Sequence, residues 1–179
     1  MEIKGATFLY TLAALMITFA GFSALLFVIR QAAGAKVSLL DRFIVKNVMA
    51  YTFVLTGAAL LPALLALFEV EETWMWRISG VLFALPMLAL QTTYPARRFK
   101  AVGARPPSPI FAVFVVLGSL VTLAMLVYVL AGVRYAAAVY ITAITIDFFT
   151  VIFGFVNALD IIMQQPVQAP RRQRKEHVH

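Results

Sequence analysis

Five long apolar segments, separated by short polar ones, most constrain how this chain can fold. An α-helix rises 1.5 Å per residue, so about 20 apolar residues cross a hydrocarbon layer of roughly 30 Å. Hydrophobic residues make up 63% and charged residues 13% of the 179 positions, whereas soluble domains are about 45–50% apolar and about 25% charged. The sequence therefore predicts an all-α, polytopic integral membrane protein, a five-transmembrane-helix bundle. The predicted spans cover about 7–29, 47–68, 78–94, 110–131 and 136–158.

The predicted spans form one domain, residues 1–163, followed by a basic tail, residues 164–179, that we expect to be disordered. The first apolar run could instead be a secretory signal peptide, because Lys4 precedes it and residues 33–35 resemble a cleavage site. Such signals carry roughly 7–15 apolar residues. The run at 7–29 is longer, so we interpret it as a retained helix.

Three connections give further predictions. Ser38 and Asp41 have the spacing of a helix N-terminal capping box, which favours an interfacial helix before the second span, with a solvated loop as the alternative. Residues 95–109 contain four prolines and a glycine, which predicts an irregular loop. Residues 132–134 leave so short a turn that the fourth and fifth helices should be antiparallel neighbours.

Basic residues alternate between the predicted sides of the membrane. The first connection, the third connection and the tail each hold four Lys or Arg residues, which is twelve of the 15 in the chain. The other side holds Lys4, Arg77 and Arg134, together with the acidic cluster at 69–72. Cytoplasmic loops are enriched in Lys and Arg. We therefore expect an outside N-terminus and a cytoplasmic C-terminus, in the cytoplasmic membrane of a bacterium.

The last apolar segment carries an acidic residue, Asp147, near its midpoint. A charge at the centre of a membrane costs about 2.5–3.5 kcal/mol or more, so such residues face a protein interior or a water-filled cavity. Asp147 is the only charged residue in the five predicted spans. Without a nearby cation, desolvation favours the neutral acid. We expect Asp147 to face the inside of the bundle, either protonated or in a hydrated cavity.

Other polar residues are candidates for an intramembrane site with Asp147. Helical spacing places Tyr140, Thr150 and Asn157 on the same face of the last span. Hydroxyl groups at similar depth in other spans belong to Thr18, Thr56, Ser119 and Thr122. Gln91 and Asn157 also fall near the ends of predicted spans, where interfacial hydration explains their polarity.

Two functions follow from this pattern. In the first, Asp147 fixes helix packing, and the chain is a small membrane protein that acts as an assembly subunit or a homo-oligomer. In the alternative, Asp147 carries a proton or binds a substrate in a proton-linked or small-solute transporter. The sequence has no internal repeat of the kind that many transporters use, which favours the first function.

Enzyme chemistry has no support in the sequence. The chain has no cysteine, and its only histidines are His177 and His179 in the basic tail, where exposure to solvent explains them. It lacks H-E-x-x-H, G-x-S-x-G and a glycine-rich phosphate loop. We therefore expect no enzymatic activity, no cofactor and no metal site.

The net charge of +7 suggests anionic partners. In a chain this apolar, cytoplasmic loops and anionic lipid headgroups explain it, and no base-reading element points to nucleic acid. The expected partners are the bilayer, anionic headgroups at its cytoplasmic face, and a second copy or another membrane protein. The residues expected to contact headgroups are Arg97, Arg98, Lys100, Arg171, Arg172, Arg174 and Lys175.

Overall fold

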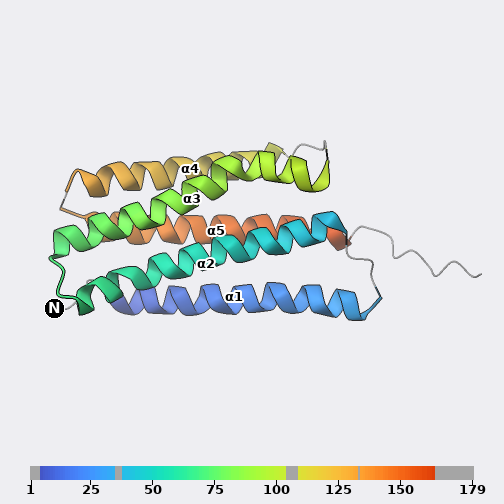
Figure 1. Cartoon of the computed structure of the whole chain (residues 1–179), viewed down its shortest axis with the longest axis horizontal. Coiled ribbons are helices and arrows are strands. Elements are labelled where there is room, and N and C mark those ends of the chain that lie inside the picture. The colour runs from blue at the N-terminus through green and yellow to red at the C-terminus, as the bar shows by residue number, and fades with distance from the viewer. Residues whose placement is uncertain (1–4, 35–37, 104–108, 133, 164–179) are drawn as a thin grey trace, which may run out of the picture.

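The computed structural model describes residues 5–34, 38–103, 109–132 and 134–163 (Figure 1). Within these ranges the chain forms five helices and no strand. The helices are α1 (Ala6–Ala32), α2 (Leu39–Leu67), α3 (Glu72–Val102), α4 (Pro109–Leu130) and α5 (Ala136–Met163). Each is long and apolar enough to cross a membrane. The all-α fold and the five predicted helices are confirmed.

The helices run side by side along the long axis of the molecule (Figure 1). Each helix packs on the next in sequence, and α2 also packs on α5, so that α2 and α5 form the centre of the bundle. At one end of the bundle, which we call the basic end, α1, α3 and α5 end and α2 and α4 begin (Figure 1). The α2–α3 and α4–α5 connections lie at the opposite, acidic end, and α4 and α5 are neighbours as predicted.

α2 begins at Leu39, earlier than the span predicted from residue 47. Ser38 and Asp41 form the predicted capping box: the Asp41 N–H donates to Ser38 Oγ at 3.0 Å, and the Ser38 N–H donates to Asp41 Oδ2 at 2.9 Å. Arg30 Nη1, at the end of α1, lies 3.6 Å from Asp41 Oδ1 and forms an ion pair between α1 and α2. The interfacial segment is therefore the first part of one continuous helix.

α3 extends well beyond the predicted span at 78–94. The prediction of an irregular loop from Pro95 onward is wrong as far as Val102, because the helix continues through the proline and ends at Gly103, whose φ is +84°. A proline within a helix leaves the carbonyl four residues earlier without its N–H partner. The carbonyl that Pro95 leaves unpaired in this way is that of Gln91, and the neighbouring Leu90 carbonyl accepts a hydrogen bond from Arg97 Nη2 at 2.7 Å. Residues 104–108 of the predicted loop lie outside the described ranges.

Pro62 in α2 frees the carbonyl of Ala58 in the same way, and a side chain from α5 takes the place of the lost donor. The Tyr140 hydroxyl donates to the Ala58 carbonyl at 2.8 Å. Tyr140 is fully buried and packs against the rings of Trp76 and Phe83. The proline and the tyrosine therefore fix α2 against α5 at the centre of the bundle.

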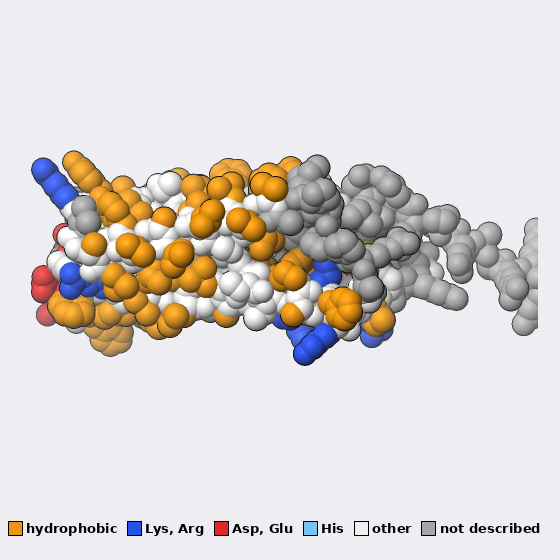
Figure 2. Space-filling view, turned by 90° about the horizontal axis from the view of Figure 1, so that it is seen from above, with side chains coloured by type: hydrophobic (Ala, Val, Ile, Leu, Met, Phe, Trp, Pro, Cys, Tyr) orange, Lys and Arg blue, Asp and Glu red, His pale blue; other side chains and the backbone are white. Residues whose placement is uncertain are grey.

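The outer surface is strongly apolar. Large side chains such as Phe53, Leu85, Val113 and Phe149 are each at least 60% exposed. Figure 2 shows hydrophobic side chains along the length of the visible side, with acidic side chains at one end only. Apart from Asp147, the charged side chains of the described residues therefore lie toward the ends of the bundle.

Candidate functional site

Three helices bring polar side chains together around Asp147 in the bundle core. Asp147 of α5 has no exposed surface, and neither has Thr122 of α4, while Gln91 of α3 is 3% exposed. The Thr122 hydroxyl donates to Asp147 Oδ2 at 2.7 Å, and Gln91 Nε2 donates to Asp147 Oδ1 at 3.1 Å. A buried carboxyl group therefore has a side-chain partner on each oxygen, each from a different helix.

Gly118 provides the space for this cluster. A Cβ atom at position 118 would lie 2.9 Å from Asp147 Oδ1 and 3.0 Å from Gln91 Nε2. Contacts that close are rarely seen for a real Cβ, and the two neighbouring atoms are held by the hydrogen bond between them. The glycine thus allows the side chains from α3 and α5 to meet against the backbone of α4.

The hydrogens in the cluster show how it can hold a proton. The Thr122 hydroxyl has one hydrogen, yet its oxygen lies within hydrogen-bond distance of both Asp147 Oδ2 and the Gly118 carbonyl, the latter at 2.9 Å. If Asp147 is neutral, its own O–H donates to Thr122, and Thr122 donates to Gly118. If Asp147 is ionised, the Thr122 hydrogen turns to the carboxylate. Rotation of this one hydroxyl group therefore lets Thr122 pair with either form of the Asp147 carboxyl group.

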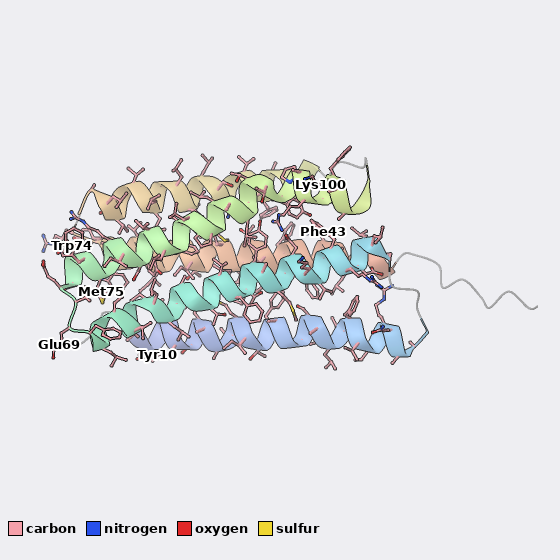
Figure 3. All side chains as sticks on the ribbon, viewed as in Figure 1. Tyr10, Phe43, Glu69, Trp74, Met75 and Lys100 are labelled. Atoms are coloured by element: carbon pink, nitrogen blue, oxygen red, sulfur yellow. The ribbon has the colours of Figure 1, made fainter. Side chains whose placement is uncertain are left out.

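A pocket of about 60 Å³ adjoins Asp147 on the side toward the basic end. Its walls come mainly from α2, α3 and α5, and its polar lining consists of Asp147, Gln91, Thr150, Asn47, Tyr51 and Tyr94. Phe43, which lies at the basic end of α2 in Figure 3, marks the outer limit of the pocket. A water molecule needs roughly 10–15 Å³ of such space and two or more polar partners, so the pocket has room for a few waters.

Two oxygen atoms in the pocket wall are buried without a hydrogen-bond partner among the described residues. They are Asn47 Oδ1 and Gln91 Oε1, and their residues are 8% and 3% exposed. An unsatisfied buried acceptor costs about 1–3 kcal/mol. Both oxygens can only accept a hydrogen bond, so the pocket favours an occupant that donates one, such as water or a small solute with N–H or O–H groups.

Of the four hydroxyl groups predicted as partners of Asp147, the structure places only Thr122 against it. Thr18, Thr56 and Ser119 each donate to the carbonyl four residues earlier in their own helix, at 2.8–2.9 Å. This bond is the usual one for hydroxyl side chains in a helix interior.

The residues predicted on the Asp147 face of α5 have three different positions. Thr150 lines the pocket and donates to the Ile146 carbonyl at 2.9 Å. Tyr140 lies toward the acidic end and bonds to Ala58 rather than to Asp147. Asn157 Nδ2 donates to the Phe153 carbonyl at 2.8 Å.

Gln91 is the site residue that sequence reasoning missed. Its interpretation as an interfacial residue is wrong, because the amide is buried and bonded to Asp147. The polar run at 91–93 resembles the end of a span, but α3 continues to Val102 and places Gln91 well inside the helix. Its spacing from Met87 and Tyr94, which line the same pocket, is the periodic signal that could have revealed it.

The predicted headgroup-contact residues within the described ranges are at the basic end. Arg97, Arg98 and Lys100 lie on the last turns of α3, and Lys100 appears at that end in Figure 3. Arg98 Nη1 lies 3.4 Å from the Tyr94 hydroxyl. The predicted contacts at 171, 172, 174 and 175 lie outside the described residues, as does the rest of the tail.

The fold and the site define a bundle of five helices of membrane-spanning length with a carboxyl-centred cluster in its core. Comparison of the chain with protein-family models, curated proteins and solved structures finds no match. The chemistry of the site is therefore argued from its geometry alone. That geometry provides a buried carboxyl group, a hydrogen-bond partner for each of its oxygens and a pocket beside them.

Proposed function

We propose that the chain is an integral membrane protein of the bacterial cytoplasmic membrane, with an outside N-terminus and a cytoplasmic C-terminus. The apolar outer surface and the length of the five helices support the embedding. The orientation is supported by the basic end, where Arg30, Arg42, Lys46 and Lys100 lie beside Arg97 and Arg98. Glu69, Glu71 and Glu72 lie at the other end.

The orientation can be tested directly because the chain has no cysteine of its own. A single cysteine is placed at Glu71 or at Gln173, and intact cells are treated with a membrane-impermeant thiol reagent. We expect labelling of Glu71→Cys only, since it lies on the outside in this topology. Labelling of Gln173→Cys but not of Glu71→Cys would overturn the orientation.

We further propose that the protein is a proton-linked carrier of a small solute. The observation that carries this proposal is the pocket that reaches Asp147 from the basic end. A carboxyl group that only held helices together would need no adjoining space with unpartnered acceptors. Ionisable groups inside a membrane commonly belong to proton or substrate pathways. In this function Asp147 takes up and releases a proton, and Asn47 and Gln91 accept hydrogen bonds from the solute.

The proton site is tested with an apolar carbodiimide, which reacts with protonated carboxyl groups in apolar surroundings. We expect one addition, located at Asp147 by peptide mass spectrometry, that increases as the pH falls. Asp147→Asn keeps the shape of the side chain but cannot react at this position. Absence of modification at Asp147 over the whole pH range in which the protein stays folded would contradict a proton-binding role.

The carrier function is tested in proteoliposomes that contain a trapped pH-sensitive dye. Small amines, amino acids and organic acids are added outside, one at a time, and proton movement is recorded. We expect movement with one class of solute in the wild type, none with Asp147→Asn, and normal movement with Thr18→Val as a matched control. A solute-dependent signal that survives in Asp147→Asn would refute the assigned role of this residue.

A second candidate function is a packing role, in which the chain is an assembly subunit or a homo-oligomer. It is favoured by the two hydrogen bonds that link Asp147 to α3 and α4. In that case Asp147→Asn, which can still accept and donate hydrogen bonds, should leave the assembly unchanged. The substitution should also make no difference to the proton movement recorded in proteoliposomes. Asp147→Leu should instead weaken the bundle, seen as a lower unfolding temperature in mild detergent.

A further inference from the structure

A second hollow, of about 520 Å³, lies at the basic end between the start of α2 and the end of α3. Four of the side chains that line it are basic: Arg42 and Lys46 from α2, and Arg97 and Lys100 from α3. None of the described side chains that line it is acidic. Helical spacing explains the arrangement, because residues three or four positions apart share one face of a helix.

Little within the described part of the chain neutralises these four charges. Arg42, Lys46 and Lys100 are exposed and have no hydrogen-bond or ion-pair partner among the described residues. The nearest acidic side chain in sequence, Asp41, is buried and engaged with Ser38 and Arg30. The hollow therefore concentrates positive charge and leaves most of its donor groups available.

Arg97 differs from the other three because its guanidinium group is held in place. Its Nε donates to Thr93 Oγ1 at 3.1 Å and its Nη2 donates to the Leu90 carbonyl at 2.7 Å. A guanidinium group presents five N–H donors in a fixed plane, so donors remain beyond these two bonds and the interaction with the Tyr51 side chain. A positioned arginine beside exposed lysines is a combination well suited to a phosphate group, which accepts several charge-assisted hydrogen bonds at once.

The remaining lining of the hollow is consistent with a lipid rather than a soluble phosphate compound. Leu39 is 69% exposed and lines the hollow, and Phe43 lines both the hollow and the Asp147 pocket. Apolar and basic side chains thus lie next to each other in the hollow. A phospholipid needs both, because its charged headgroup is joined to apolar acyl chains. Basic pockets between helices at the cytoplasmic side are suited to anionic headgroups.

We propose that Arg42, Lys46, Arg97 and Lys100 bind the phosphate group of an anionic phospholipid. This site rests on the membrane embedding proposed above but not on the proton-linked function. None of its four basic side chains lines the Asp147 pocket, although Phe43 and Asn47 line both. A bound lipid bridges α2 and α3, whose side chains also form two walls of the pocket beside Asp147.

Binding is measured by native mass spectrometry of the full chain, released from detergent in the presence of phosphatidylglycerol or phosphatidylcholine. We expect retained phosphatidylglycerol and little retained phosphatidylcholine. The double variant Lys46→Gln/Lys100→Gln should bind phosphatidylglycerol about 30-fold more weakly, because each cation near a headgroup contributes about 1 kcal/mol and 1.4 kcal/mol corresponds to tenfold.

The matched control is Arg77→Gln/Arg134→Gln, which removes the same charge at the acidic end of the bundle. It should bind phosphatidylglycerol as the wild type does. An equal loss in this control would mean that the attraction depends on net charge only, and would overturn the site. Unfolding temperatures of both double variants are measured alongside, and if Lys46→Gln/Lys100→Gln does not fold, Arg42→Gln/Lys46→Gln replaces it as the site variant.

Inorganic phosphate distinguishes the two sources of a phosphate group. If millimolar phosphate displaces the lipid completely and binds the wild type alone, the site takes a free phosphate and the lipid assignment is wrong. If the chain fails to enter vesicles of any composition, the membrane embedding itself fails. If it enters vesicles but shows no preference for phosphatidylglycerol, only the site proposed here is refuted.

Discussion

At the scale of single residues, Gly118 has the clearest consequence for the Asp147 cluster. A methyl group at this position would lie 2.9 Å from Asp147 Oδ1 and 3.0 Å from Gln91 Nε2, so the hydrogen bond between these two atoms must open. We expect Gly118→Ala to destabilise the bundle by about 1–3 kcal/mol, the cost of overpacking together with a lost buried hydrogen bond. The measurement is thermal or denaturant unfolding in mild detergent.

Gly57 is a matched control for this substitution. It also lies inside a helix, but a Cβ there would meet nothing within 4 Å. Alanine is favoured over glycine in helices by about 0.8–1.0 kcal/mol in peptides, so Gly57→Ala should be neutral or slightly stabilising. Equal destabilisation by the two substitutions would show that the effect at Gly118 does not come from crowding of Asp147 and Gln91.

The sequence predicted part of this cluster and missed part for a physical reason. The depth of Asp147 and the absence of other charges in its span implied an inward position, and Asp147 is fully buried. Thr122 was one of four hydroxyl candidates of similar depth, and only the packing of α4 on α5 selects it. Gln91 was missed because its depth depends on how far α3 continues beyond Pro95, although its spacing from Met87 and Tyr94 was a signal for it.

At the scale of helices, the Tyr140 hydroxyl of α5 donates to the Ala58 carbonyl of α2 and so replaces the backbone N–H that Pro62 lacks. Tyr140→Phe leaves this buried carbonyl unpaired and should destabilise the bundle by about 1–3 kcal/mol. Pro62→Ala restores a backbone N–H that can bond to Ala58. We therefore expect Tyr140→Phe to cost much less in the Pro62→Ala background.

A double-mutant cycle measured by unfolding in mild detergent tests this coupling. Interaction energies of about 0.5–3 kcal/mol are typical for residues in one hydrogen-bond network. If the cost of Tyr140→Phe is the same with proline or alanine at position 62, the tyrosine acts through packing on Trp76 and Phe83 alone. The proline would then have no role in fixing α2 to α5.

The length of a helix was predictable where the helix ends together with its apolar run. It was underestimated where the helix continues into polar sequence. α1 and α4 match their predicted spans within a few residues. α2 and α3 are longer at the basic end: a capping box starts α2 at Leu39, and α3 continues through Pro95 to Val102. Hydrophobicity does not reveal the polar ends of long helices. Residues at these ends nevertheless line both the pocket beside Asp147 and the hollow at the basic end.

At the scale of the whole molecule, the pattern of packing was the least predictable feature. The short turn before α5 implied that α4 and α5 are neighbours, but nothing in the sequence indicates that α2 packs on α5. That contact decides where the pocket lies, because Asn47 and Tyr51 of α2 face Thr150 and Asp147 of α5 across it. The site is therefore a property of the assembled bundle rather than of any one helix.

Access of water to this pocket is the property on which a proton-linked function depends, and it gives a prediction for two adjacent positions of α5. Thr150 lines the pocket, whereas Phe149 is 64% exposed on the outer surface at the same depth. Thiols react as thiolates, which form only where water reaches them. We expect Ag⁺, which is small enough for a pocket of about 60 Å³, to block Thr150→Cys from the basic end and to leave Phe149→Cys free.

The measurement uses proteoliposomes treated with Ag⁺ on one side, then quenched, denatured and labelled with a fluorescent maleimide to count the remaining thiols. Because the chain has no native cysteine, each signal reports one position. Inside-out and right-side-out vesicles should give opposite results for Thr150→Cys, since the pocket extends toward one end only. A thiol at 150 that stays unreacted from both sides in a folded protein would mean that the pocket is dry, and Asp147 would then serve helix packing alone.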